Sequence, residues 1–246
     1  MGVKMEEKIL KIITILEEWK ERQIFKEIDR FYKERLKDIR ENKIMAQLQE
    51  SAKIIFHLIP FEFFISQKYY NILEYLNKIK VPSKNIFQEL YQSYNFDGLF
   101  YYSGISDGKY KKYIQIFLNG IIEVADCSHL SANEKILYIR DIEDEMIENL
   151  KGCLSLQKEL GIKIPIIFYF TFLGVKGFSI KRGDFFHLNR NYISIDREDL
   201  IFPKIIIKDF DENIEQMLRP TFDLIWNACG HQKSLFYDEN GKRKPR

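Results

Sequence analysis

Residues 98–125 read GLFYYSGISDGKYKKYIQIFLNGIIEVA, and this stretch decides the fold. It holds three runs rich in aromatic and β-branched residues, at 98–102, 110–118 and 121–125, as is typical of strands. Asp107-Gly108 lies in the first connection, and Asn119-Gly120 forms the second. Asn-Gly between apolar runs predicts a type I′ hairpin turn, because both central residues of that turn need a positive φ. We therefore expect an antiparallel meander.

Further strands and helices flank the meander. Strands are predicted at 52–60, 164–173, 177–181 and 204–208, and helices at 66–80, 83–91, 131–160 and 213–229. The third of these helices would begin at a capping box, Ser131-Ala-Asn-Glu134, and end at Gly161. Pro220 would kink or restart the last one. The fold class that follows is α+β, with the antiparallel meander inside a mixed sheet packed by helices.

A helical arm precedes this domain, with apolar residues at three- and four-residue spacing in two stripes. The first stripe is Ile9, Ile12, Ile13, Leu16 and Trp19, and the second, slightly rotated, is Phe25, Ile28 and Tyr32. A change of phase near Gln23 indicates two helices or one bent helix. Such stripes need a partner surface: the chain's own domain, a second copy or another protein. We expect another protein or a second copy.

The domain limits follow from these patterns. Residues 1–44 form the helical arm, and residues 45–232 form the α+β domain. Residues 233–246 form a polar, basic tail that ends in KRKPR, and we expect the segment from His231 onward to be loosely ordered.

The composition excludes a function that rests on net charge. Among 246 residues, 38 Lys and Arg nearly balance 36 Asp and Glu, so a net charge of +2 argues for neither nucleic acid nor a membrane. Three isolated cysteines without Cys-x-x-Cys spacing indicate a reducing compartment. The longest apolar run, at 164–175, is too short to span a bilayer. We expect a cytoplasmic protein without a membrane partner.

From about residue 33 onward, the chain resembles a known family. The matching segments, over about four-fifths of the chain, are 33–39 (KERLKDI), 52–60 (AKIIFHLIP), 95–99 (NFDGL), 113–123 (YIQIFLNGIIE), 172–177 (FLGVKG), 195–197 (IDR), 200–203 (LIFP), 218–228 (LRPTFDLIWNA) and 237–241 (YDENG). In this order they look like the region after the AlbA-type domain in bacterial proteins labelled Schlafen AlbA-type, DNA-binding or ATP-binding.

The resemblance implies a shared accessory domain. The AlbA-type domain gives that family its nucleic-acid and nucleotide labels, and here its position holds only a short helical segment. The Gly-rich strand-turn sequences of such a domain are absent. The resemblance therefore transfers neither ATP binding nor nuclease activity, and it assigns no catalytic residue.

The catalytic candidates are three carboxylates on or beside adjacent meander strands: Asp97, Glu123 and Asp126. Convergent carboxylates are what a metal-dependent nuclease needs, but no Glu-x-Lys signature follows on a neighbouring strand. There is also no phosphate-binding GxxxxGK[ST] loop. The four histidines are dispersed, without His-x-x-x-His or His-Glu-x-x-His spacing, so we predict no metal site and no cofactor.

Two basic segments with interleaved aromatic residues are candidates for nucleic-acid binding. Their basic residues are Lys109, Lys111 and Lys112 in one, and Lys181, Arg182 and Arg190 in the other. Phosphate neutralisation combined with ring stacking is how proteins hold single strands. The competing interpretation is that these lysines protect exposed strands from edge pairing and that the rings belong to the core.

These patterns favour a non-catalytic interaction or assembly subunit over an enzyme. With the resemblance, the expected setting is a bacterial complex that handles nucleic acid, defence complexes included. The proposed contact is the pair of apolar stripes on the N-terminal arm. An RNA- or DNA-binding protein that uses the basic segments is one alternative, and a metal-dependent nuclease centred on Asp97, Glu123 and Asp126 is another.

Overall fold

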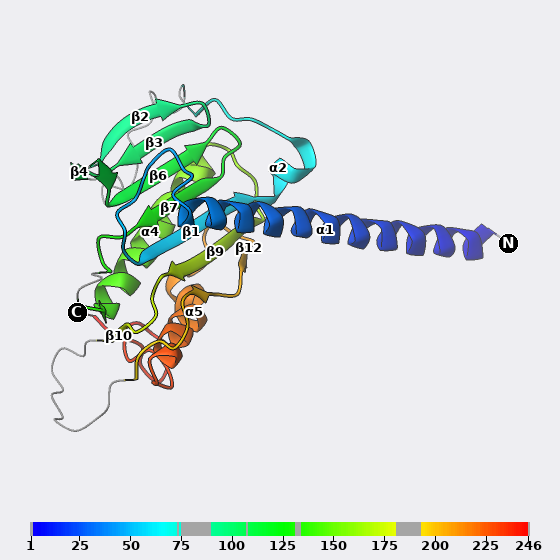
Figure 1. Cartoon of the computed structure of the whole chain (residues 1–246). Coiled ribbons are helices and arrows are strands. Elements are labelled where there is room, and N and C mark those ends of the chain that lie inside the picture. The colour runs from blue at the N-terminus through cyan, green and yellow to red at the C-terminus, as the bar shows by residue number, and fades with distance from the viewer. Residues whose placement is uncertain are drawn as a thin grey trace.

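The computed structural model describes residues 2–72, 74, 90–106, 108–130, 134–180 and 193–245. Within these residues, eight strands form one sheet in the order β11-β9-β1-β7-β6-β3-β2, with β12 also paired to β9 (Figure 1). The strands are β1 (Lys53–Pro60), β2 (Tyr91–Asn95), β3 (Gly98–Tyr102), β6 (Lys112–Phe117), β7 (Ile122–Asp126), β9 (Ile166–Leu173), β11 (Leu200–Ile201) and β12 (Ile205–Ile207). The α+β class is confirmed. The sheet is antiparallel throughout, however, rather than mixed.

Helices and short strand pairs complete the described fold. The helices are α1 (Gly2–Arg40), α2 (Phe61–Ser66), α4 (Ile139–Glu159) and α5 (Ile214–Ala228). β4 (Ile105–Ser106) pairs with β5 (Lys109–Tyr110), and β8 (Ile136–Leu137) pairs in parallel with β10 (Ser179–Ile180). No helix in the described part of the chain is long and apolar enough to cross a bilayer.

The predicted meander is β3, β6 and β7, whose pairings place Leu99 beside Ile116 and Ile114 beside Val124. The Asn119-Gly120 turn joins β6 to β7, but its type differs from the prediction. The Gly120 amide donates to Phe117 O (2.8 Å), and Gly120 alone takes a positive φ (+82°), whereas Asn119 does not. The connection is therefore a three-residue loop, in which a type I turn is followed by a bulge at Gly120. A Cβ on Gly120 would also meet Ile162 Cδ1 at 2.5 Å, so glycine is required there.

Both faces of the sheet are covered, which explains why β9 is buried along its whole length. Successive residues of a strand point to opposite faces. Phe56, Leu58 and Phe170 belong to the core under α4 and α5. Ile55 and Ile167 belong to a second core under α1 and α2 (Figure 1).

The N-terminal arm is one continuous helix of 39 residues, rather than two helices or a bent one. At about 1.5 Å per residue it is about 58 Å long. Its C-terminal half lies across the sheet, and its N-terminal half projects beyond it (Figure 1). Ile24, Ile28 and Tyr32 are buried against the sheet, so this half belongs to the domain rather than to a separate arm.

Several predicted helix limits change. α4 begins at Ile139 rather than at Ser131, because Lys135 takes a positive φ and the next two residues pair with β10 instead. Residues 131–133 lie outside the described chain, as does most of the predicted 66–80 and 83–91 helices; α2 ends at Ser66, and Tyr91 begins β2. Gly161 follows α4 with φ +69°, as predicted, and α5 continues through Pro220.

The C-terminal segment packs as part of the domain, so the prediction of a loosely ordered tail is wrong. Ser234 and Tyr237 are buried, and Tyr237 Oη donates to Glu215 O on α5 (2.9 Å). Arg243 reaches α4, where its guanidinium lies 2.7 Å from Glu143 and 2.5 Å from Asp144. Glu143 is completely buried, so its charge requires a cationic partner. No local pattern in residues 233–246 indicates that Arg243 is this partner.

Candidate functional site

The three carboxylates predicted as catalytic do not converge. Asp97 lies exposed in the turn between β2 and β3, where its amide donates to Asn95 Oδ1 (3.0 Å). Glu123 and Asp126 are both on β7, but they are three positions apart, so they point to opposite faces of the sheet. The geometry therefore does not support a nuclease centre formed by these three residues.

Glu123 is the centre of a buried polar network beneath α1. Its carboxylate accepts two hydrogen bonds from Arg35, at 2.7 and 2.8 Å, and one from Tyr113 Oη at 2.7 Å. His57 Nε2 lies 2.8 Å from the same carboxylate, so this nitrogen carries a proton. Burial opposes ionisation of Glu123, but the hydrogen bonds from Arg35 and His57 lower its pKa to about 2.

This low pKa predicts how stability depends on pH. The Glu123 pKa falls from 4.5 to about 2 on folding, so its contribution is complete above about pH 4.5 and is lost as the pH drops towards 2. We expect the difference in free energy of unfolding between the wild type and Glu123→Gln to shrink over that range. Urea denaturation at pH 5.5, 4, 3 and 2 measures it. If the free energies of unfolding of the two proteins changed in parallel with pH, the lowered pKa of Glu123 would be contradicted.

Polar contacts between α1 and the sheet continue towards the N-terminus of α1. Tyr32 Oη and Thr171 Oγ1 share a hydrogen bond, and Asp29 accepts from Tyr169 Oη and from Lys204 Nζ, the latter at 2.8 Å. These bonds fix the position of α1 along the strands of the sheet. Together with the Glu123 network, these bonds join α1 to the sheet, and we assign them a structural role. The Glu123 carboxylate accepts from three side chains, whereas His57 Nδ1 is buried without a hydrogen-bond partner among the described residues.

Asp126 belongs to a second polar cluster, on the α4 side of the sheet. Lys112 Nζ lies 3.1 Å from Asp126 Oδ2 and 2.6 Å from Glu145 Oε1, and His129 Nε2 lies 2.5 Å from Glu145 Oε2. The hydrogen bond to Glu145 raises the pKa of His129. Burial opposes ionisation of Glu145, but His129 and Lys112 lower its pKa to about 2. The sequence prediction missed His129, which follows Asp126 by three positions but has no second histidine at metal-ligand spacing, and Glu145, which lies 19 positions beyond Asp126 on α4.

The predicted nucleic-acid contacts are mostly engaged elsewhere. Lys109 pairs with Glu50 at 2.7 Å, and Lys112 is held in the Asp126 cluster. Lys111 is exposed. Lys181, Arg182 and Arg190 lie outside the described residues. The described part of these two segments therefore offers no basic surface of the kind that phosphate binding needs.

The predicted partner contacts on α1 divide into two groups. Ile28 and Tyr32 are buried in the chain's own core and Phe25 packs against it, so these three do not face a partner. Ile12, Ile13, Leu16 and Trp19 are exposed, as are Leu10 and Ile15, with Trp19 at 60%. The side chain of Ile9 is outside the described ones. An uninterrupted group of large apolar side chains therefore lies in solvent on the projecting half of α1.

The stripe around Trp19 faces away from the sheet, whereas Leu10, about five full turns before Ile28, has the direction of Ile28 and is exposed on the projecting half of α1. Each residue turns an α-helix by about 100°, so the direction of Trp19 recurs at Lys26, Arg30 and Lys37, which are all exposed. The two stripes are therefore on different sides of α1, about 150° apart, and not slightly rotated as predicted. The projecting stripe cannot be buried by the domain that carries it.

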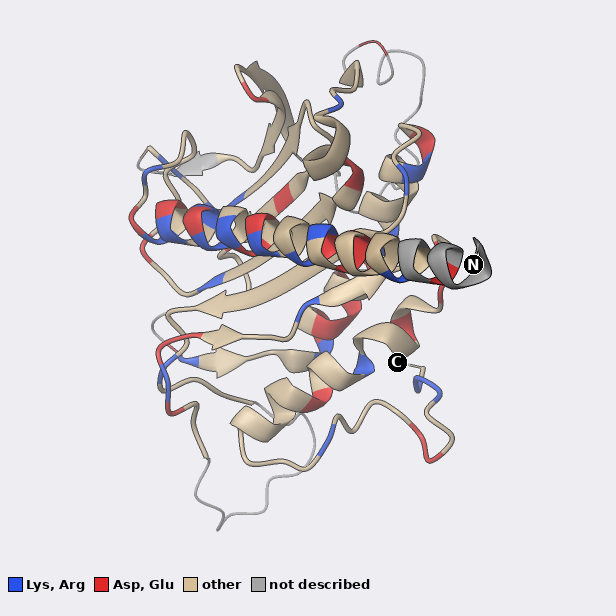
Figure 2. Ribbon diagram, turned by 90° about the vertical axis from the view of Figure 1, so that its right-hand side faces the viewer, with Lys and Arg blue, Asp and Glu red and all other residues tan. Residues whose placement is uncertain are grey.

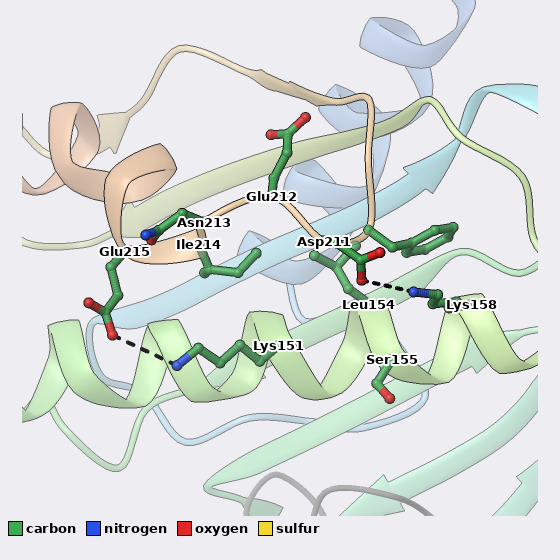
Figure 3. A pocket seen from close by; sticks show the side chains of 10 residues that line it. Lys151, Leu154, Ser155, Lys158, Asp211, Glu212, Asn213, Ile214 and Glu215 are labelled. Atoms are coloured by element: carbon green, nitrogen blue, oxygen red, sulfur yellow. Dashed lines mark hydrogen bonds and ion pairs between the residues drawn. The ribbon is translucent and has the colours of Figure 1, made fainter.

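A groove lies between α4 and the start of α5 (Figure 3). It has a volume of about 460 Å³. Its charged groups pair with each other: Lys158 lies 2.9 Å from Asp211, and Lys151 lies 3.9 Å from Glu215. Only Leu154 and Ile214 among its lining residues are buried, so it lacks the convergent, desolvated polar groups of a ligand site.

No protein-family model, curated protein or solved structure matches this chain.

Proposed function

We propose that the chain is a non-catalytic assembly subunit that associates through the projecting half of α1. The observation that carries this proposal is the exposed apolar group formed by Leu10, Ile12, Ile13, Ile15, Leu16 and Trp19. Contiguous exposed apolar surface on a soluble protein marks an interaction site. Because this half of α1 projects beyond the sheet and Trp19 points away from it, the domain does not cover these side chains, and another molecule can. The resemblance described above supports a bacterial nucleic-acid-handling complex as the setting.

The partner that the charges favour is the same helix of a second copy, in antiparallel orientation. Residues 4–11 hold three lysines against two glutamates, and residues 17–22 hold three glutamates against one lysine and one arginine. The two ends of the projecting half therefore carry small charge excesses of opposite sign. Charges of both signs are interspersed along the part of α1 that Figure 2 colours. An antiparallel pair brings the slightly positive end of one helix opposite the slightly negative end of the other, and the two macrodipoles also oppose each other. Such a contact is isologous and closes as a dimer.

The test is the oligomeric mass. We expect the wild type to have twice the 29.6 kDa chain mass at tens of micromolar, by sedimentation equilibrium. Leu16→Glu with Trp19→Glu should weaken association by at least about 100-fold, because two central apolar contacts become charged. Thr14→Glu, on the polar side of the same helix, adds a charge outside the interface and should leave the dimer intact.

A wild type that stays monomeric under these conditions would remove the self-association proposal, as would a double variant that associates normally.

A truncation of α1 must leave the buried residues of the domain core in place. Deleting residues 1–20 removes the projecting stripe and leaves Ile24 in place, whereas deleting residues 1–35 would also strip buried residues of α1. The shorter truncation should fold and be monomeric.

A further inference from the structure

We propose that Asp126, His129 and Glu145 form a binding site for a divalent first-row metal ion, of the Zn²⁺ or Mn²⁺ class. One ligand atom from each of the three side chains lies within 4.8 Å of the other two. They come from the end of β7, the following loop and α4, so the tertiary structure brings them together. An imidazole with two carboxylates is a mixed nitrogen and oxygen ligand set, which suits Zn²⁺ and Mn²⁺ better than ions that prefer oxygen alone.

The spacing needs only a small adjustment to hold an ion. Ligand atoms at about 2.1 Å from a tetrahedral zinc are about 3.4 Å from each other. The 2.5 Å contact between His129 Nε2 and Glu145 Oε2 would open, and the wider separations would close. Both side chains are partly exposed and can make these shifts, and their exposure gives the ion a path from solvent.

Neighbouring groups already orient the carboxylates, as the surroundings of metal ligands do. Ser128 donates to Asp126 Oδ1 from its amide (2.7 Å) and from its hydroxyl (2.5 Å), which leaves Oδ2 directed at the cluster. Asn149 Nδ2 lies 3.4 Å from Glu145 Oε1. A cavity of about 20 Å³ adjoins the cluster, with Asp126, Glu145 and Asn149 among its lining residues and apolar side chains making up the rest.

Lys112 occupies the place that the ion would take. Its ammonium contacts both carboxylates but neutralises only one of their two charges, so a divalent ion satisfies them better. Lys112 lies on β6 directly beside Asp126, and its long side chain can turn towards solvent when the ion enters. The lysine-paired state and the metal-bound state therefore compete for the same oxygen atoms.

The experiment titrates the full-length protein with ZnCl₂ by calorimetry and with MnCl₂ by the loss of the free Mn²⁺ signal in electron paramagnetic resonance. We expect one ion per chain, with affinity reduced at least about 10-fold in His129→Ala and in Glu145→Gln. Glu148→Gln, an exposed carboxylate one turn along α4, is the matched control and should bind as the wild type does. Lys112→Met should bind more tightly, because the competing ammonium is removed.

Circular dichroism shows whether each variant is folded. Asp126→Asn should also weaken binding, but Asp126 is the most buried ligand and this variant can fail to fold. The test then rests on His129→Ala, which alters a loop. The proposal is overturned if wild-type protein binds neither ion at millimolar concentration, if His129→Ala and Glu145→Gln bind as tightly as the wild type, or if Lys112→Met binds no more tightly. This site is separate from the projecting helix, so either proposal can fail alone.

Discussion

Replacing Glu123 with alanine is expected to lower the free energy of unfolding by about 3–5 kcal/mol, a range typical of breaking a buried ion pair from one side. The loss is large because Arg35 then keeps a mostly buried charge without its bidentate partner, and the hydroxyl of Tyr113 and the imidazole of His57 each lose an acceptor. Buried polar groups left without partners cost far more than the hydrogen bonds contributed net. Urea denaturation followed by circular dichroism measures the difference.

Two controls separate this network from ordinary loss of a carboxylate. Glu148→Ala removes a half-exposed glutamate that pairs with Lys151, and it should change the free energy of unfolding by less than about 1 kcal/mol. Arg35→Met combined with Glu123→Leu removes both charges, and the double variant should be more stable than Glu123→Ala. A Glu123→Ala protein as stable as the wild type would mean that the network does not hold α1 on the sheet.

Replacing Arg243 with alanine should have an effect of the same size, about 3–5 kcal/mol, although Arg243 lies only three residues from the end of the sequence. Glu143 is completely buried, and its carboxylate accepts from Trp226 Nε1 (2.9 Å), Ser234 Oγ (3.0 Å) and Arg243. Without the guanidinium it is a buried charge supported by neutral donors alone. Burial already raises the pKa of Glu143, and the substitution should raise it further.

The matched control is Lys242→Ala, because Lys242 is a neighbouring basic residue whose side chain is exposed. It should unfold within about 0.5 kcal/mol of the wild type, as surface substitutions usually do. Thermal and urea unfolding of both variants decide the point. If Arg243→Ala and Lys242→Ala unfold alike, the C-terminal segment is not part of the cooperative fold.

The sequence predicted those parts of the fold that depend on neighbours in the chain. Residues 98–125 hold three runs rich in aromatic and β-branched residues and carry Asn119-Gly120, and the meander formed where expected. Gly161 ended α4, and Asn213 caps α5 by accepting from the Gln216 amide (3.2 Å). The errors arose where distant segments competed with a local signal. The capping box at Ser131 did not begin α4, because the segment at Ile136 pairs with β10.

The candidate sites were less predictable than the fold. Periodicity identified the apolar stripes of α1 correctly, but only the docked structure shows that Ile28 faces the sheet and Trp19 faces solvent. Asp126 was recognised as a candidate, but its neighbours His129 and Glu145 were not. Glu123 was grouped with Asp126, although the Glu123 side chain points to the opposite face of the sheet. A residue type indicates what chemistry is available, and the fold decides which groups meet.

The sequence by itself determined the strands, the tight turns and the amphipathic helices, because backbone sterics and hydrogen bonding act between residues a few positions apart. Tertiary structure alone decided that Arg35 meets Glu123, 88 positions away, and that Arg243 meets Glu143, 100 positions away. Burying a charge is costly unless a partner comes with it, so these pairings form only when the core closes. That closure also leaves one stripe of α1 outside, and it is there that we expect a second chain to bind.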